Sequence, residues 1–592
     1  ITLAPDLAEA HGRAGVVLEA LGRQEEAEAS LRQAAALDPG YGEWQGRLGA
    51  LLLDRGRGDE ALVCFDRAIA LKMVDAGLLI NRGTLLGNRG RYDEAMNDLR
   101  RACELAPDLP EAYLVMGRMH DRRNRFAEAE ACFRRVVELQ PEHAEAHFSI
   151  ANALWFRGAH AEAVAGFRRV IALDPGFLPA QVNLIFSLDT DPARTLADHL
   201  EERRAFHRFH IARGVGAAYS YDNDPDPERP LRIGYVSSDF RRHSAARVVG
   251  PVLFNHDRDR FIVHCYSGVA VEDDMTERFR RHASVWRRTK TLSDQALADM
   301  VRADGIDILV DLSGYTSSCR LLVFARKPAP VQVTAWGCAH GTGLSTVDAL
   351  FADPVYIPPG DRQFFAESVI DLPSFMPYQA SEQAPAVAPL PALTAGHVTF
   401  GCLNNIIKIT SQAIAIWAKI MNAVPGARFR VKDSMLDDPN QRRRIMALFA
   451  DNGVDAGRLD LLGQTNHVDH LAAYGAVDIA LDPFPQNGGV STLEALWMGV
   501  PVVVLAGTTP AGRNGIAINT GIGLDRFVAA TPEAYQDIAI AAAGDLAGLA
   551  DLRGALRRRV ATSPFGDHAR YIRAVEDAYR TLWRRWCAGR GR

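Results

Sequence analysis

The stretch LDPFPQNGGVSTLEALWMGVPVVV, residues 481–504, predicts a strand, a tight turn, a helix and a second strand in succession. The turn carries a glycine pair, Gly488 and Gly489, and the helix opens through Ser491 and Thr492. The first N–H groups of a helix have no partner within the helix, and the helix dipole makes that end attractive to negative charge. Together with the two hydroxyl groups, these N–H groups form an anion site suited to a pyrophosphate.

Glu494 lies one turn into the same helix, where its carboxylate could accept hydrogen bonds from ribose hydroxyls. The same residues also fit an ordinary capped turn, with Glu494 as the third-position partner of a capping box. A nucleotide site and a purely structural turn are therefore equally compatible with this stretch taken alone.

Strand-like and helix-like stretches alternate from residue 231 up to and through this stretch. The predicted strands are 231–236, 261–267, 306–312, 331–336, 398–402, 428–432, 459–462, 479–481 and 501–505. The predicted helices are 244–255, 275–282, 293–303, 411–423, 441–453, 468–474 and 491–498. Such alternation is typical of parallel sheets covered by helices, so we expect an α/β fold of two Rossmann-like lobes. The first lobe is placed at 231–380, a Pro/Ala-rich linker at 381–396, and the second lobe with a C-terminal helix at 397–592.

Several basic side chains lie where such lobes bind ligands, at the carboxyl ends of strands or at helix starts. His243 follows the first strand of the first lobe, and Lys408 follows the first strand of the second lobe. His467 and His470 lie near a helix start, where a ring could stack on a nucleobase. A lone histidine is more often an ordinary surface or core residue, and a lysine often only extends its stem over apolar neighbours.

The composition excludes several other classes of protein. The chain has 592 residues, 48% of them apolar, and a net charge of −5, which argues against a nucleic-acid or membrane-surface binder. No run of about 18 apolar residues occurs, so no membrane span is expected. The cysteines never form a CxxC pair, and no His, Asp and Glu cluster has metal-site spacing. We therefore expect no metal cofactor, no disulfide framework and a reducing, cytoplasmic environment.

The first third of the chain repeats itself every 34 residues. The register carries Pro5, Pro39, Pro107, Pro141 and Pro175, then Gly15, Gly49, Gly83 and Gly117, and then Ala27, Ala61, Ala95, Ala129 and Ala163. This pattern is typical of the tetratricopeptide repeat, a helical hairpin whose small residues allow close packing. We expect five repeats and a partial sixth over 1–194, then a linker helix and a Pro/Asp-rich linker over 195–230. The helix at 195–214 is expected to pack on the first lobe.

Stacked hairpins form a superhelix whose concave groove usually binds extended peptide, so we expect protein or peptide acceptors there. A passive spacer or dimerisation arm is the alternative. Related arrays hold peptide backbone with asparagines, and the corresponding positions here are Arg13, Arg47, Asn81, Val115, Ser149 and Asn183. Because only two of these are asparagine, the sequence supports peptide selection weakly. The chain begins at Ile1 within a repeat, so we expect the natural N-terminus upstream, and a targeting segment stays open.

Four longer motifs follow the array. They are LRIGYVSSDFRRHS (231–244), RKPAPVQVTAWG (326–337), FGCLNNIIKIT (400–410) and LDPFPQNGGVSTLEALWMGVP (481–501). A tetratricopeptide array followed by these motifs resembles glycosyltransferase family 41, which contains the protein O-GlcNAc transferases and the SPINDLY-type protein O-fucosyltransferases. The resemblance covers nearly the whole chain. It implies a GT-B fold, a nucleotide-sugar donor, inversion at the anomeric carbon and no metal ion.

The resemblance also implies roles for particular residues. His243 matches the family's active-site histidine, Lys408 the lysine that neutralises the departing diphosphate, and His470 the histidine that stacks on the base. The turn 488–492 matches the pyrophosphate-binding helix start, and Glu494 stands where the family places an acidic ribose ligand.

The chain departs from the family pattern at several donor-facing positions. The loop 337–343 reads GCAHGTG where GYPGT[ST]G is common, and we expect its Thr342 and Gly343 to border the donor sugar. Asn405, also expected at the donor, stands where the O-GlcNAc transferases have glutamine, and Gly489 stands where some members have histidine. The long insertion between the lobes of animal O-GlcNAc transferases is absent. These changes bear on the identity of the sugar more than on catalysis.

We therefore expect a cytoplasmic, metal-independent protein O-glycosyltransferase that uses UDP-GlcNAc. GDP-fucose is the second expectation, a flagellin-type transferase with another activated sugar the third, and a non-catalytic tetratricopeptide scaffold the fourth. A Ser/Thr hydroxyl would attack the anomeric carbon while the diphosphate leaves toward Lys408 and the helix at Ser491. The general base is left open between His243 and water.

Overall fold

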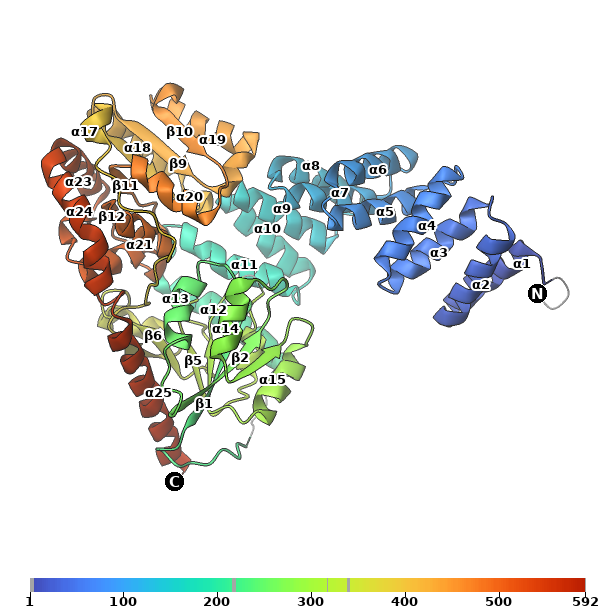
Figure 1. Cartoon of the computed structure of the whole chain (residues 1–592), viewed down its shortest axis with the longest axis horizontal. Coiled ribbons are helices and arrows are strands. Elements are labelled where there is room, and N and C mark those ends of the chain that lie inside the picture. The colour runs from blue at the N-terminus through green and yellow to red at the C-terminus, as the bar shows by residue number, and fades with distance from the viewer. Residues whose placement is uncertain (1–4, 216–219, 317, 338–340, 591–592) are drawn as a thin grey trace. The chain divides into compact units, whose positions relative to one another are not determined.

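The computed structural model describes residues 5–215, 220–316, 318–337 and 341–590. The chain divides into two compact units, Ile1–Pro175 and Gly176–Arg592 (Figure 1). Within the described ranges, no helix is both long enough and apolar enough to cross a bilayer.

The first unit is built of helical hairpins, as the 34-residue period predicts (Figure 1). Its helices pair as α1 (Ala8–Ala20) with α2 (Gln24–Leu37), α3 (Gly42–Asp54) with α4 (Gly58–Ala70), α5 (Ala76–Asn88) with α6 (Tyr92–Leu105), α7 (Pro110–Arg122) with α8 (Phe126–Leu139), and α9 (Ala144–Phe156) with α10 (His160–Leu173). The register alanines Ala27 and Ala129 are fully buried. A Cβ on Gly117 would lie 2.5 Å from the Phe133 ring, so the absent side chain is what lets the ring pack. The packing confirms the tetratricopeptide register.

The first lobe of the second unit is a parallel sheet in the order β3-β2-β1-β4-β5-β6-β7. Its strands are β1 (Leu231–Ser237), β2 (Phe261–Ser267), β3 (Val285–Arg288), β4 (Ile308–Asp311), β5 (Val331–Thr334), β6 (Ala349–Ala352) and β7 (Ser368–Asp371). The second lobe is a parallel sheet in the order β10-β9-β8-β11-β12-β13. Its strands are β8 (Thr399–Cys402), β9 (Arg428–Lys432), β10 (Leu459–Leu462), β11 (Ile479–Leu481), β12 (Val502–Leu505) and β13 (Val528–Ala529). This architecture confirms the expected pair of Rossmann-like lobes.

Helices connect and cover the two sheets (Figure 1). They are α11 (Leu178–Ser187), α12 (Leu196–Ala212), α13 (Ala246–Leu253), α14 (Asp274–His282), α15 (Asp294–Ala303), α16 (Leu321–Ala325), α17 (Ala392–Ala395), α18 (Ser411–Ala423), α19 (Pro439–Ala450), α20 (His467–Ala472), α21 (Val490–Trp497), α22 (Asn514–Gly521), α23 (Pro532–Gly544), α24 (Leu546–Thr562) and α25 (His568–Arg590). The sequence pattern misses the strands β3, β6, β7 and β13. Three of these, β3, β7 and β13, are edge strands, and β3 and β7 are only partly buried, so they carry no continuous apolar run.

The strand order places a topological switch point in each sheet. In the first sheet β1 lies between β2 and β4, and in the second β8 lies between β9 and β11. Connections from the two neighbouring strands at such a point leave in opposite directions, which opens a crevice at the carboxyl ends of the strands. Lys408 follows β8 and the turn 482–489 follows β11, so both flank the switch point of the second sheet.

Helix α12 packs on the first lobe, which confirms the expectation for residues 195–214. Its Phe206 shares a buried cluster with Ile185 of α11, Val236 of β1 and Tyr315. The Phe206 ring meets the Tyr315 ring edge-on, with 5.4 Å between the ring centres.

Helix α25 also packs on the first lobe, although sequence order places it in the second. Its Tyr571, Val575 and Trp583 lie in one buried cluster with Ile233 and Val310 of the first sheet. In Figure 1 the dark red helix runs back from the second lobe along the first. An apolar helix face packs wherever it buries most surface, and chain order alone does not reveal that place.

Candidate functional site

The turn after β11 is held by a buried carboxylate. Asp482 accepts a hydrogen bond from the Gly488 N–H at 3.1 Å and one from the Thr492 hydroxyl at 3.4 Å. Burial raises the pKa of Asp482 to about 7, although these two donors and Lys408 oppose the rise. Since the Thr492 side chain is turned toward Asp482, the first N–H groups of α21 and the Ser491 hydroxyl are the groups of this turn that could bind an anion.

The N-terminus of α21 is open. Its N-cap is Gly489, no side chain caps it, and the helix begins at Val490. Glu494 is therefore the fifth residue of the helix, so the alternative reading of Glu494 as a capping-box partner is wrong. The unsatisfied N–H groups give this end of the helix a partial positive charge.

Lys408 joins this turn from the other strand of the switch point. It lies at the end of a short 3₁₀ helix (Ile406–Lys408), and its Nζ donates to the Asn487 carbonyl oxygen at 2.8 Å. Burial lowers the pKa of Lys408, and Asp482 opposes that shift. The lysine and the open end of α21 thus present positive charge at one place. Asn405 caps the 3₁₀ helix, because its Oδ1 accepts from the Ile407 N–H at 3.1 Å.

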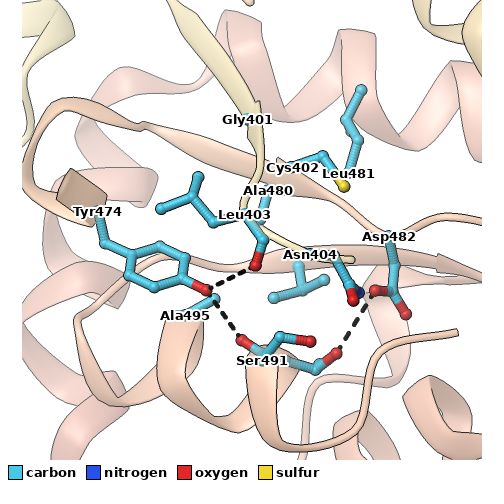
Figure 2. Close-up of a pocket in the computed structure, with 12 residues that line it drawn as sticks. Gly401, Cys402, Leu403, Asn404, Tyr474, Ala480, Leu481, Asp482, Ser491 and Ala495 are labelled. Atoms are coloured by element: carbon cyan, nitrogen blue, oxygen red, sulfur yellow. Dashed lines mark hydrogen bonds between the residues drawn. The ribbon is translucent and has the colours of Figure 1, made fainter. Parts of the chain in front are cut away.

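Figure 2 shows a small pocket at the carboxyl ends of β8 and β11. Asn404, Asp482 and Ser491 border it, and the Tyr474 hydroxyl lies 3.2 Å from the Ser491 carbonyl oxygen. A Cβ on Gly488 would fall 2.7 Å from the Ser491 Oγ and 2.4 Å from the Thr492 Oγ1. The absent side chain of Gly488 therefore keeps open the space in front of the helix start.

Glu494 is the centre of a second group of polar side chains. Its carboxylate lies 3.5 Å from the Arg247 guanidinium, 3.6 Å from the His467 Nε2 and 3.8 Å from the His470 Nε2. Burial raises the pKa of Glu494 to about 7, opposed by Arg247. Burial lowers the pKa of both His467 and His470 to about 4, so both rings are neutral near pH 7. A neutral ring beside a carboxylate offers a flat, partly apolar surface next to a hydrogen-bond acceptor.

His243 lies on the first-lobe segment that faces α21. Four residues further on, Arg247 reaches Glu494, so this segment borders the crevice. The His243 Nδ1 lies 3.7 Å from an Asp239 carboxylate oxygen and accepts from the Ala245 N–H at 3.3 Å. Burial lowers the pKa of His243, and Asp239 opposes that shift.

Thr342 and Gly343 lie in the first lobe, in the connection after β5. Thr342 is fully buried, and its N–H donates to Glu367 at 2.5 Å. Gly343 has a φ of +69°, a value that favours glycine. Residues 338–340 of the loop 337–343 lie outside the described residues.

Metal-binding side chains do not gather in the part of the chain that the structure describes. Across these residues there is no group of three His, Cys, Asp or Glu side chains that could hold a metal ion. Lys408 and the start of α21 supply positive charge at this turn from the chain's own groups.

Comparison with known families identifies the second unit. A family model described as glycosyl transferase family 41 matches residues 186–378 and 390–575. The chain belongs to this family. Tetratricopeptide repeat models match residues 8–41, 76–109 and 114–176, so this family 41 member carries a repeat array before its lobes.

The relatives of this family 41 chain carry transferase names. A Petunia hybrida protein described as probable UDP-N-acetylglucosamine–peptide N-acetylglucosaminyltransferase SPINDLY is 40% identical over 377 residues, covering 62% of this chain. An Arabidopsis thaliana protein with the same description but named SEC is 28% identical over 376 residues, covering 61% of this chain. The chain spans 40% and 38% of the length of these two relatives.

A solved structure shares most of the architecture of this family 41 chain. A mutant of the Thermobaculum terrenum O-GlcNAc transferase superposes with a TM-score of 0.81 at 34% sequence identity. The match covers 87% of this chain and 99% of that one. A GT-B arrangement of the two lobes, as expected from the resemblance, is consistent with this match.

Two residues of the site were not singled out in the sequence. Asp482 is the first residue after β11. Side chains at the end of a switch-point strand often face the ligand, so this position could have identified Asp482 from the sequence. Arg247 lies in the same stretch as His243, but its pairing with Glu494 joins residues of different lobes and leaves no local signal.

Proposed function

We propose that this chain is a metal-independent protein O-glycosyltransferase that transfers a sugar from a nucleoside diphosphate to Ser or Thr of a protein, with inversion at the anomeric carbon. The observation that carries the proposal is the meeting of Lys408 with the open start of α21 at the switch point of the second sheet. A cation and a helix N-terminus together suit a diphosphate that gains negative charge as it leaves. The transferase names of the relatives support the same reaction class.

The nucleotide would span the second lobe. The pyrophosphate lies against Ser491 and the N–H groups of α21, Glu494 accepts from the ribose hydroxyls, and the base stacks on His470. Arg247 lies near one oxygen of this carboxylate, and a carboxylate has lone pairs enough to accept from the ribose as well. The sugar then projects toward Thr342, Gly343 and Asn405, with His243 near the acceptor hydroxyl.

In the transfer step, the acceptor oxygen forms a bond to the anomeric carbon as the bond to the diphosphate oxygen breaks. The electron pair of the broken bond stays on the diphosphate, where Lys408 and the helix start stabilise it. The acceptor proton passes to His243 or to water. Holding donor and acceptor in one crevice replaces a collision in solution by an oriented contact.

UDP-GlcNAc is the donor we propose first. GDP-fucose is the second candidate, because the SPINDLY relative is 40% identical and the SEC relative 28%, and the SPINDLY-type branch includes fucosyltransferases. We propose that the repeat array binds the acceptor proteins.

The test combines binding and transfer. Titration calorimetry with UDP-GlcNAc, GDP-fucose and a CMP-sugar identifies the donor, and mass spectrometry of an acceptor protein detects the attached sugar. Transfer is expected to continue in EDTA, because the site supplies its own positive charge. Loss of transfer in EDTA with recovery on adding Mn²⁺ would contradict the proposed mechanism, and binding of none of these donors would contradict the proposed function.

A further inference from the structure

A buried glutamate supports the short turn that contains Thr342 and Gly343. Glu367 precedes β7 and is 4% exposed. Its Oε1 accepts from the Thr342 N–H at 2.5 Å and also from the Thr342 hydroxyl. That hydroxyl accepts in turn from the Leu344 N–H at 3.1 Å. One carboxylate oxygen thus organises the backbone from residue 342 to residue 344.

Two glycines allow this turn to pack closely against Glu367 and Arg203. Gly341 and Gly343 have φ values of +71° and +69°. A Cβ on Gly341 would lie 2.7 Å from the Glu367 Oε2, and one on Gly343 would lie 2.5 Å from the Cβ of Arg203. The turn therefore rests directly on Glu367 on one side and on Arg203 of α12 on the other.

Arg203 and Glu367 are both buried, and each has a polar atom without a hydrogen-bond partner among the described residues. Arg203 is 3% exposed. Among the described residues, the Arg203 Nε and the Glu367 Oε2 have no hydrogen-bond partner. Burial raises the pKa of Glu367, and the positive charge of Arg203 opposes that rise. Buried polar atoms without partners cost free energy, and these two belong to the side chains that flank the turn.

The turn also lies at the end of the first sheet that borders the crevice. It follows β5, and the hydroxyl of Tyr315, which follows β4, donates to the Thr342 carbonyl oxygen at 2.6 Å. The turn is therefore held at the carboxyl ends of these strands, where such lobes bind their ligands. His243 follows β1 at the same end, and Arg247, four residues further on, reaches Glu494 of α21.

We propose that Glu367 is a positioning residue for the donor sugar. Supported by Arg203, it holds the turn 341–344 in the one backbone conformation that receives the sugar, and it makes no contact with the nucleotide. This inference rests on the proposed nucleotide-sugar chemistry. It predicts that Glu367 governs the preference for a nucleotide sugar over the free nucleoside diphosphate.

The test compares three variants by calorimetry and steady-state kinetics with the preferred donor. Glu367→Ala should weaken binding of the nucleotide sugar about tenfold, as expected for the loss of a hydrogen bond to a charged group, and leave binding of the nucleoside diphosphate unchanged. The KM of Glu367→Ala for the donor should rise in proportion to this loss of affinity. Glu367→Gln should keep most of the preference, because its amide oxygen can still accept from the Thr342 N–H. Thr342→Val removes the hydroxyl that donates to Glu367 and accepts from the Leu344 N–H, but keeps the Thr342 N–H. It should give a smaller shift in the same direction, and it tests the proposal if Glu367→Ala does not fold.

Glu576→Ala is the matched control. Glu576 is also a buried glutamate in the first-lobe core, and its Oε1 accepts from the Asp257 N–H at 2.9 Å. Glu576→Ala should lower the melting temperature without changing the ratio of the affinity for the nucleotide sugar to that for the nucleoside diphosphate. An unchanged ratio in Glu367→Ala and Thr342→Val, or an equal loss for both ligands, would overturn the positioning role. A wild-type protein that binds no nucleotide sugar would instead overturn the proposed function.

Discussion

At the scale of single residues, Lys408 is the side chain on which the proposed chemistry depends most. Lys408→Ala should lower the transfer rate on the order of 10²–10³-fold, because one preorganised charge that stabilises the leaving group is lost. Binding of the nucleoside diphosphate should change much less, since the start of α21 remains. Single-turnover kinetics and calorimetry measure the two effects separately.

Lys432 offers a control for this variant. It is also a buried lysine in the second lobe, and its Nζ donates to the Gly463 carbonyl oxygen at 2.6 Å. Lys432→Ala should destabilise the fold and leave the single-turnover rate of the folded protein within a few-fold of the wild type. Equal rates in the two variants would remove Lys408 from the mechanism.

Glu494 should make nucleotide binding depend on pH. Its pKa is raised to about 7 by burial, so the carboxyl is protonated below that pH and charged above it. The charged form accepts ribose hydroxyls better, so affinity for the nucleoside diphosphate should increase from about pH 6 to about pH 8. Glu494→Gln should flatten this dependence, and the ionisation of the nucleotide itself is common to both proteins.

The raised pKa of Glu494 also affects stability. Whereas the affinity for the nucleotide should rise with pH, the stability of the fold should decrease. The folded protein binds the Glu494 proton more tightly than the unfolded chain, so the free energy of unfolding should fall as pH rises through about 7. Urea unfolding of the wild type and of Glu494→Gln over this range measures the difference. A wild-type profile identical to that of Glu494→Gln in both experiments would contradict the raised pKa.

At the scale of elements, the N-terminus of α21 provides a test with neighbouring glycines. A Cβ at Gly488 would fall within 2.8 Å of three side-chain atoms, whereas one at Gly489 would meet only the Met376 Cε, at 3.6 Å. Gly488→Ala should therefore weaken nucleoside diphosphate binding about tenfold or more by closing the space before the helix. Gly489→Ala should bind nearly as the wild type does, and similar losses in both would show that this helix start does not bind the diphosphate.

The sequence predicts some elements of this site to the residue and others not at all. Residues 428–432, 459–462 and 479–481 are predicted as strands and form β9, β10 and β11 with the same bounds. Each is followed directly by an aspartate or a glycine, residues that disfavour strands and so mark its end. The turn after β11 is visible in the sequence as a glycine pair. The pairing of Arg247 with Glu494, and the support of Thr342 by Glu367, join distant parts of the chain and leave no periodic signal.

At the scale of the whole molecule, the repeat array and the lobes should have separable tasks. Deleting residues 1–175 removes the first compact unit and keeps α11 and α12, which pack in the core of the first lobe. The shortened protein should keep transfer to a short peptide and lose most of its transfer to whole proteins, because an array that binds the acceptor, as we propose, raises its local concentration. Rates with a peptide and with a protein that contains the same peptide measure the difference.

Circular dichroism of the shortened protein provides the control, since it should retain a cooperative melting transition. Equal rates with peptide and protein acceptors in a folded, shortened protein would make the array a spacer.

The return of α25 to the first lobe also bears on how the protein is made. A ribosome completes the strands of the first lobe, then the whole second lobe, and only then the helix that brings Tyr571 and Trp583 into the first lobe's core. The first lobe therefore cannot finish folding while the second is being translated. Its apolar face stays exposed in the nascent chain until α25 has been synthesised. A premature stop anywhere in the second lobe leaves that lobe incomplete and also deprives the first lobe of the α25 residues in its core.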